Sequence, residues 1–462
     1  SSREERIIKY LMDFGMKHQL ETITDEVGNV VIRKPAAKGY ENRKTVCLQT
    51  HVDMVAEKNS HSNHNFDTDP IHPFVDGAWR KARETTLGAD NGIGIASQLA
   101  ILSDTGLEHG PIECLFTVEE ELGLKGAFNL KPDFLRSKIL INLDSEDEGE
   151  LFIGCAGGID TTATISYKTR KVPANSVAYQ IEVSGLKGGH SGDDINKFRG
   201  NSIKLLNRFL WTVSKRMPVR ITNFKGGNLR NAIPREAMAV ITVIQSKSQL
   251  LKDEFQKFCI AVKNELSDTE PDVKLEMKSA DLPQKVLKRK FQRRMLNLLY
   301  GCPHGVISMS KSIQNLVETS TNLASVRFTD YQTFTVCTSQ RSSVESEKQN
   351  ITNTVKSIFK LAKAKVKNSD GYPGWDPDNN SEILKTSFDS YQKLFGNEPL
   401  VKAVHAGLEC GLFLEKYPEL DMISFGPTIR GAHSPDEKVE ISTVKKYWDL
   451  LLEVLVDIPE QD

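Results

Sequence analysis

The stretch LQTHVDMVAE, residues 48–57, decides where the chain builds its sheet and where its chemistry begins. The apolar residues 46–48 that lead into it are typical of a buried strand. Because side chains alternate along a strand, His51 and Asp53 are expected to point the same way. Two polar groups at the end of a core strand need a partner. A metal site and a satisfied hydrogen-bond pair in the core are both compatible with this stretch alone.

The bulk composition restricts the class of protein. A chain of 462 residues exceeds a single hydrophobic core, so two domains, or one domain split by an insertion, are expected. The net charge of -1 argues against nucleic acid or an anionic membrane as the main partner. No apolar run is long enough to span a bilayer. The 7 cysteines lack a CxxC pair and are typical of reduced core residues, which predicts a cytoplasmic protein.

The first part of the chain, residues 1–157, alternates helix and strand patterns. Helices are expected over 3–18 and 91–104, and strands over 28–35, 45–54, 112–121 and 138–146. This alternation predicts an α/β sheet covered by helices. Sites in such sheets form at the carboxyl ends of the strands, where this chain places most of its histidine and acidic candidates.

After residue 157 the pattern changes to βαββαβ, which is the ferredoxin-like order. Strands are expected over 178–186, 219–224, 236–245 and 272–280, and helices over 201–216 and 249–266. The segment continues with helices over 283–299 and 349–366 and strands over 317–329 and 331–341. From 158 to 372 it has the length of about two ferredoxin-like units, although its second half fits βαββαβ poorly.

The motif GYPGWDPD, residues 371–378, is typical of a linker, and α/β character returns after it. A helix is expected around 387–396, a strand over 421–428 and a last helix over 441–458. We therefore predict a mixed-sheet α/β catalytic domain in two pieces, residues 1–157 and 373–462. An α+β lid domain with a ferredoxin-like unit, residues 158–372, is inserted between them.

Acidic and imidazole side chains gather at the predicted strand ends with almost no Lys or Arg among them. The candidates are His51, Asp53, Asp90, Glu119, Glu120, Glu121, Asp144, His190 and His433. Taken singly, Asp90 fits a helix N-cap or a glycine-rich phosphate loop. The three glutamates fit a solvent-exposed helix start, and Asp144 fits an ordinary surface charge. Taken together, crowded carboxylates repel one another unless a cation compensates.

The ligand types indicate which cation this would be. Oxygen and nitrogen ligands without thiolates suit zinc, with cobalt and manganese as alternatives. The candidates outnumber the ligands of one tetrahedral site. The sequence therefore predicts two divalent metal ions that share a carboxylate.

Six motifs match a known family in order. They are HVDMVAE, GADNGIG, EEELG, NLDSE, GGHSG and GPTIRGAHSPDE, and through them the chain resembles the dinuclear zinc exopeptidases related to aminoacylase and carnosinase. A finer resemblance, to members that cleave Xaa-His dipeptides, covers essentially the whole chain. It is carried by LINLDSE, GCAGGID, LKGGHSG, LRNAIPREA, YPGW, HAGLECGLF and HSPDE.

The resemblance implies a role for each metal-site residue. Asp90 would bridge the two metals, with His51 and Asp144 completing one site and Glu121 and His433 the other. The family's acidic motif is Asp-Glu-Glu-x-Gly, and Glu119 stands here in place of its Asp.

This register makes Glu120 the general base. Asp53 would hold the ring of His51 from outside the metal shell. His190 would donate to the oxyanion, Arg341 would bind the substrate carboxylate, and Asn231 would lie nearby. His405 and Glu409 are weaker candidates for the amino end of the substrate.

The expected activity is that of a dinuclear metallopeptidase that cuts unblocked Xaa-His dipeptides such as β-alanyl-histidine (carnosine). In the resemblance, Asp at position 144 goes with dipeptidases rather than carboxypeptidases or acylases. A broad dipeptidase and an N-acyl amino acid deacylase stay open as alternatives. So do a nucleotide-binding α/β protein and a silent metal-binding module, although an unligated Glu120 argues against the last. The resemblance also implies a homodimer.

Overall fold

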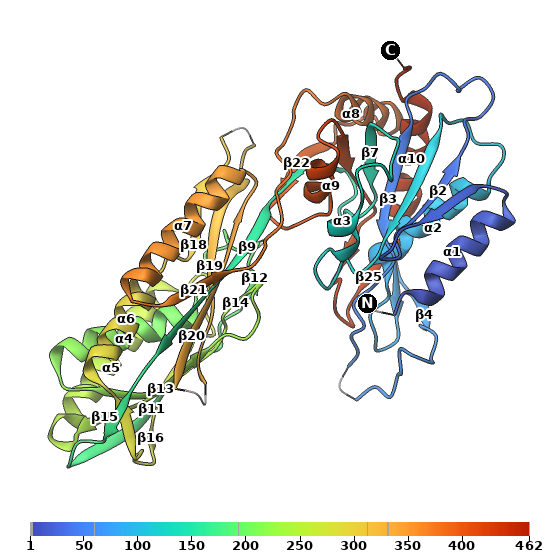
Figure 1. Cartoon of the computed structure of the whole chain (residues 1–462). Helices are drawn as coiled ribbons and strands as arrows, with labels where there is room; N and C mark the ends of the chain where they lie inside the picture. The colour runs from blue at the N-terminus through green and yellow to red at the C-terminus, as the bar shows by residue number, and fades with distance from the viewer. Residues whose placement is uncertain (1–2, 60, 193, 312, 330–331, 462) are drawn as a thin grey trace. The chain divides into compact units, whose positions relative to one another are not determined.

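The computed structural model describes residues 3–59, 61–192, 194–311, 313–329 and 332–461 (Figure 1). The chain forms two compact units. Unit 1 contains Ser1–Cys155, Trp375–Val404 and Leu408–Asp462, and unit 2 contains Ala156–Gly374 and His405–Gly407. The divisions lie two residues from the boundaries expected at 157 and 372. The short return of the chain to unit 2 at His405–Gly407 was not predicted.

Unit 1 is built on a mixed sheet of eight strands in the order β1-β2-β6-β3-β7-β23-β8-β22. These are β1 (Glu21–Thr24), β2 (Val30–Lys34), β3 (Val46–His51), β6 (Ile112–Thr117), β7 (Ile139–Asn142), β8 (Glu150–Cys155), β22 (Leu400–Val404) and β23 (Asp421–Ser424). Strand β3 runs parallel to both β6 and β7, and β7 runs parallel to β23. The carboxyl ends of these four strands therefore lie at one edge of the sheet.

Helices pack on this sheet as the sequence predicts. Helix α1 (Glu5–Lys17) contacts β1 and β2, and α2 (Ala89–Ser103) contacts β3. Helix α8 (Glu382–Phe395) contacts β8 and β23, and α10 (Ile441–Asp457) packs on α8. The shorter helices α3 (Lys125–Asn129) and α9 (Cys410–Lys416) contact each other. A four-stranded sheet joins β24 (Ile429–Arg430), β25 (Lys438–Glu440), β5 (Trp79–Ala82) and β4 (Pro73–Asp76).

Unit 2 contains a long antiparallel sheet in the order β16-β11-β15-β13-β19-β20-β9-β21, with β18 (Gly305–Met309) paired to β19. Its first half is the predicted ferredoxin-like unit. The elements are β11 (Ser176–Ser184), α4 (Ser202–Arg216), β13 (Arg220–Gly226), β15 (Ala237–Ile244), α5 (Ser248–Glu265) and β16 (Lys274–Ala280). The fourth strand lies beside the first, and the third and second strands follow.

The second half of this sheet repeats the same topology. Its elements are β9 (Gly157–Ser166), α6 (Arg289–Gly301), β19 (Val317–Thr329), β20 (Thr333–Ser342), α7 (Glu345–Leu361) and β21 (Lys365–Asn368). Again the fourth strand lies beside the first, followed by the third and the second. The first ferredoxin-like unit is inserted between β9 and α6, and one bridge between β13 and β19 joins the two halves.

Some predicted element boundaries in unit 2 are wrong. The helix expected over 283–299 begins only at Arg289, because Lys285–Leu287 forms strand β17 against β10 (Thr169–Lys171). The helix expected to reach residue 366 ends at Leu361, and the alternating Lys365–Asn368 becomes the edge strand β21. The strand expected over 331–341 is β20, and residue 331 lies outside the described residues.

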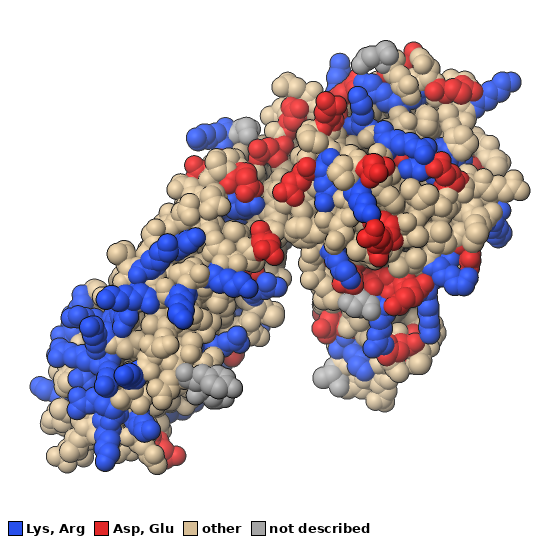
Figure 2. Space-filling model, in the orientation of Figure 1, with Lys and Arg blue, Asp and Glu red and all other residues tan. Residues whose placement is uncertain are grey.

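Charge is divided unevenly between the two units. Residues 156–374 hold 35 Lys and Arg but only 18 Asp and Glu, and unit 1 carries the compensating acidic excess. Figure 2 shows Lys and Arg gathered over one end of unit 2. The whole-chain charge of -1 is therefore the sum of a positive charge on unit 2 and a negative charge on unit 1. Within the described residues, none of the helices has the length and apolar character that crossing a bilayer requires.

Candidate metal centre

Five segments of unit 1 bring their polar side chains together at the carboxyl edge of the sheet. His51 is the last residue of β3, Asp144 follows β7, and the glutamates follow β6. Asp90 belongs to the first turn of α2, but its backbone is non-helical (φ -87°, ψ 104°). His433 lies between β24 and β25 in the left-handed region at φ 64°.

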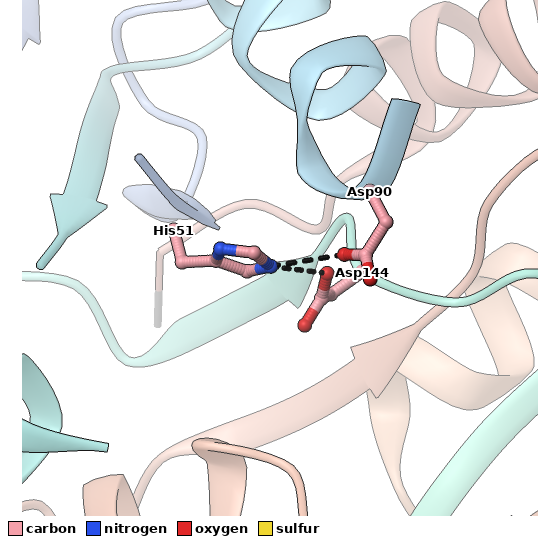
Figure 3. Close-up of side chains that lie close together, drawn as sticks. All are labelled: His51, Asp90 and Asp144. Carbon is pink, nitrogen blue, oxygen red and sulfur yellow. Dashed lines mark hydrogen bonds and ion pairs between the residues drawn. The ribbon is translucent and has the colours of Figure 1, made fainter. Parts of the chain in front are cut away.

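The first group joins His51, Asp90 and Asp144, which point toward one another in Figure 3. The Nε2 atom of His51 lies 3.0 Å from Asp90 Oδ1 and 3.3 Å from Asp144 Oδ1. The other ring nitrogen, Nδ1, donates to the backbone carbonyl of Asp53 at 2.9 Å. That bond aims Nε2 at the two carboxylates.

The second group uses the other oxygen of Asp90. His433 Nε2 lies 3.1 Å from Asp90 Oδ2 and 3.0 Å from Glu121 Oε2. The two carboxylate oxygens of Asp90 thus face two different histidines. These two groups are the ligand sets implied by the family resemblance.

The charges in the cluster hold one another in unusual protonation states. Burial opposes protonation of His51, but the carboxylates of Asp144, Asp53 and Asp90 together outweigh it and raise the pKa of His51 well above its usual value. Hydrogen bonds to Asp90 and Glu121 raise the pKa of His433 to about 11. Although burial disfavours a charged Asp90, hydrogen bonds from the two histidines lower its pKa. Two imidazolium protons supply the positive charge that the carboxylates need.

The residues fit divalent cations in place of those protons. Three carboxylates and two imidazoles offer oxygen and nitrogen ligands, and the described part of the chain adds no thiolate to these groups. Glu121 Oε1 is buried and has no hydrogen-bond partner among the described residues. An unpaired buried carboxylate oxygen is costly, and a cation would satisfy it.

Asp53 contacts more than the ring of His51. Its Oδ1 lies 3.5 Å from His51 Nδ1 but accepts a hydrogen bond from the Glu120 backbone N–H at 2.9 Å. Its Oδ2 accepts from the Glu121 N–H at 3.3 Å. Asp53 therefore fixes the backbone of the two glutamates, while its carbonyl rather than its carboxylate makes the short bond to His51.

Glu120 lies beside the ligands, with a carboxylate oxygen within 4.8 Å of ligand atoms of His51 and Glu121. Burial is the main cause that raises its pKa well above the usual value, and Asp144 and Glu409 add to it. Glu409 is itself buried and accepts from Gln49 Nε2 at 2.6 Å and Thr117 Oγ1 at 2.7 Å. Burial raises the pKa of Glu409 to about 7. Two carboxyl groups thus lie at the cluster without being in its two main ligand sets.

Two supporting residues were not singled out from the sequence. Asn91 donates to Asp144 Oδ1 and to the carbonyl of Leu143 at 3.0 Å. Glu437 binds the backbone around Asp90. Both stand inside quoted motifs, GADNGIG and HSPDE, so their motif membership was the available signal.

The predicted substrate-binding residues all belong to unit 2. His190 lies in β12 (Gly189–His190), which pairs with β14 (Ala232–Ile233), and Ser191 N donates to Asn231 O at 2.7 Å. His190 and Asn231 are therefore neighbours. Arg341 lies in β20 and donates to Tyr372 Oη at 2.9 Å.

The two weaker candidates for the amino end of the substrate, His405 and Glu409, belong to different units. His405 belongs to unit 2, where its Nε2 bonds Ser320 Oγ at 2.7 Å. Glu409 belongs to unit 1.

Two carboxylates and two imidazoles around a shared aspartate form the ligand set of a two-metal hydrolase. Comparison with known proteins agrees: residues 47–457 match the model of peptidase family M20/M25/M40, and the chain belongs to this family. It is 46% identical over 459 residues to the cytosol non-specific dipeptidase of Escherichia coli (strain K12), covering 99% of this chain and 94% of that one.

Solved structures give the same result. The crystal structure of aminoacylhistidine dipeptidase from Vibrio alginolyticus superposes with a TM-score of 0.89 and 43% identity, covering 100% of this chain and 94% of that one. A tripeptidase from Staphylococcus aureus, at a TM-score of 0.56 and 15% identity over 99% of this chain and 94% of that one, shares the fold. These matches confirm the predicted α/β class with an inserted α+β lid.

Asp90→Asn should remove both metal ions, because each proposed site uses one oxygen of this carboxylate. His433→Ala should remove only one, since His51, Asp90 and Asp144 stay in place. Metal content after dialysis, measured by atomic emission, tests both. Two ions retained by Asp90→Asn would contradict the shared-aspartate arrangement.

Proposed function

We propose that this protein is a metal-dependent dipeptidase that hydrolyses unblocked Xaa-His dipeptides such as β-alanyl-histidine. It would use two divalent cations, with zinc as the first choice and cobalt and manganese as alternatives. The observation that carries the proposal is the pair of Asp90 oxygens, each facing a histidine and each joined by a further carboxylate. Likeness to the Vibrio alginolyticus enzyme supports the histidine preference. Likeness to the Escherichia coli enzyme supports a broader dipeptidase as the second candidate.

In the proposed mechanism, Glu120 moves the proton. Two bound cations would acidify water and polarise the peptide carbonyl. Glu120 accepts a proton from the attacking water while the water oxygen forms a bond to the carbonyl carbon of the substrate. When the C–N bond breaks, Glu120 returns this proton to the leaving amine. Burial raises the pKa of the Glu120 carboxyl, which makes its carboxylate a stronger base for the first step.

Residues of unit 2 are proposed to bind the substrate. His190 donates a hydrogen bond to the oxyanion, and the neighbouring Asn231 binds the substrate backbone. Arg341 binds the carboxylate of the dipeptide with its guanidinium fork. Unit 2 as a whole, bounded near residues 158 and 372, is proposed to act as the lid.

The surroundings of Arg341 support its role. Its side chain is only 7% exposed, and no described carboxylate pairs with it. The Nε atom is buried and has no hydrogen-bond partner among the residues that the structure describes. A buried charge without a counterion is costly, so an anionic ligand group would relieve it. Tyr372, the partner of Arg341, lies where a Cβ on Gly158 would stand only 2.6 Å from its ring.

We propose a cytoplasmic location, in keeping with 7 free cysteines, and a homodimer. Neither nucleic acid nor a membrane is proposed as a partner.

Purified protein should hydrolyse β-alanyl-histidine, lose activity with a chelator, and regain it when Zn²⁺, Co²⁺ or Mn²⁺ is added. A panel of free dipeptides separates strict from broad specificity, and N-acylated amino acids test the deacylase alternative. Histidine release measured by chromatography is the assay. Full activity after metal removal, or cleavage of N-acylated substrates alone, would refute the proposal.

Glu120→Gln should keep the metal content, because Glu120 is not in the two main ligand sets, but lose its proton-transfer function. We expect kcat to fall by at least about 10²-fold, as for loss of a general base. Atomic emission and steady-state kinetics report the two effects separately. An active variant would exclude Glu120 as the base.

Arg341→Ala should cost about 2–5 kcal/mol in dipeptide binding, which is roughly 30-fold or more in kcat/KM. Dipeptide amides, which lack the carboxylate, should lose far less. Arg208→Ala is the control, since this arginine pairs with Glu265 elsewhere in unit 2. Equal losses for acids and amides would count against the carboxylate role.

A further inference from the structure

One buried carboxylate outside the proposed ligand sets binds the segment that carries Asp90. Glu437 Oε2 accepts hydrogen bonds from the backbone N–H groups of Leu87 at 2.7 Å and Gly88 at 2.9 Å. Its Oε1 accepts from Ala89 at 2.7 Å and Asp90 at 3.3 Å. Four consecutive amides thus converge on one side chain.

The backbone of Glu437 is tied to the other metal-site loop. Its N–H donates to the Ser434 carbonyl at 3.0 Å, one residue after His433. Ser434 Oγ in turn donates to the Gly431 carbonyl at 2.7 Å and accepts from Asp436 N at 3.2 Å. The turn that presents His433 therefore also presents the Glu437 carboxylate.

These bonds lie at the start of α2. The first N–H groups of a helix lack intrahelical acceptors, and the helix dipole favours a negative charge there. Glu437 is 2% exposed, and within the described ranges it forms no ion pair with Lys, Arg or His. The four amides are consequently its main charge compensation.

The same bonds set the direction of Asp90. The chain enters α2 through Gly88 at φ 72°, and Asp90 itself is non-helical, so helical geometry does not orient its side chain. The hydrogen bonds to Glu437 instead hold the backbone from which this side chain extends. Asp90 and His433 are 343 residues apart in sequence, and one side chain connects their two loops.

We propose that Glu437 is a positioning residue that fixes Asp90 against His433, so that both can face one cation. The inference rests on the proposed metal centre and goes beyond its ligands. Glu437 touches neither substrate nor metal in this role. It acts through the two residues that it holds in register.

Glu437→Gln tests the proposal, because an amide keeps one acceptor oxygen and turns an NH₂ group toward backbone donors. We expect about 10–100-fold weaker binding of the cation held by Asp90, Glu121 and His433. Titration of metal-free protein with Co²⁺, followed by visible absorption, measures this. Saturating metal should restore kcat, which a general loss of structure would not allow.

Asp421→Asn is the matched control. Asp421 accepts from the Ile383 N–H at 2.9 Å at the start of α8, and it stands at the opening residue of β23, away from the carboxyl ends that carry the ligands. This variant should lower the melting temperature and leave Co²⁺ affinity unchanged.

Glu437→Asp covers the case in which the Gln variant does not fold. It keeps the charge at the helix start but is one methylene shorter, so it should also weaken Co²⁺ binding. Wild-type affinity in the folded Gln or Asp variant, with only reduced thermal stability, would overturn the proposal. If the wild-type protein itself binds no Co²⁺, the metal centre fails instead.

Discussion

The repulsion among carboxylates around Asp90 is the constraint on which unit 1 depends. Asp90, Glu121 and Asp144 converge with the buried His51 and the exposed His433. Without a cation, the two imidazoles balance the carboxylate charges by staying protonated, and their pKa values are raised well above the usual value. The ligands come from segments that only the folded chain brings together. Metal binding and the folding of unit 1 are therefore coupled.

The parts of the site that the sequence predicted are those written locally. Strand β3 and His51 follow from one apolar run, and the resemblance to the family's Asp-Glu-Glu-x-Gly motif, which ends here at Gly123, gives the register of Glu120 and Glu121. The contacts between distant segments could not be read in this way. Asp53 was expected to hold the ring of His51, yet its carboxylate mainly binds the backbone of the two glutamates. Nothing in the local pattern assigned Glu437 to the Asp90 loop.

The fold shows the same division between local and distant order. The first ferredoxin-like unit was predicted because its six elements are consecutive. The second was suggested only by the length of the segment, and its order was not recognised because β9 is separated from α6 by the whole first unit. Its other strands read as a poor βαββαβ until β9 is placed between β20 and β21. The net charge of -1 likewise does not reveal that the chain has a basic unit and an acidic unit.

The two units carry complementary electrostatic needs. Unit 1 brings together carboxylates that a cation would stabilise. Unit 2 buries Arg341, which donates a hydrogen bond to the neutral hydroxyl of Tyr372. Arg341 stands opposite Gly158 in the ladder of β20 and β9, and the Tyr372 ring also fills the space beside Gly407. Side chains at either glycine would collide with this ring. A free dipeptide offers a carbonyl suited to a metal centre and a carboxylate suited to a buried arginine. If Arg341 binds the substrate as proposed, a substrate without that carboxylate would leave the cost of burying this arginine unrelieved, which favours substrates with a free carboxyl end.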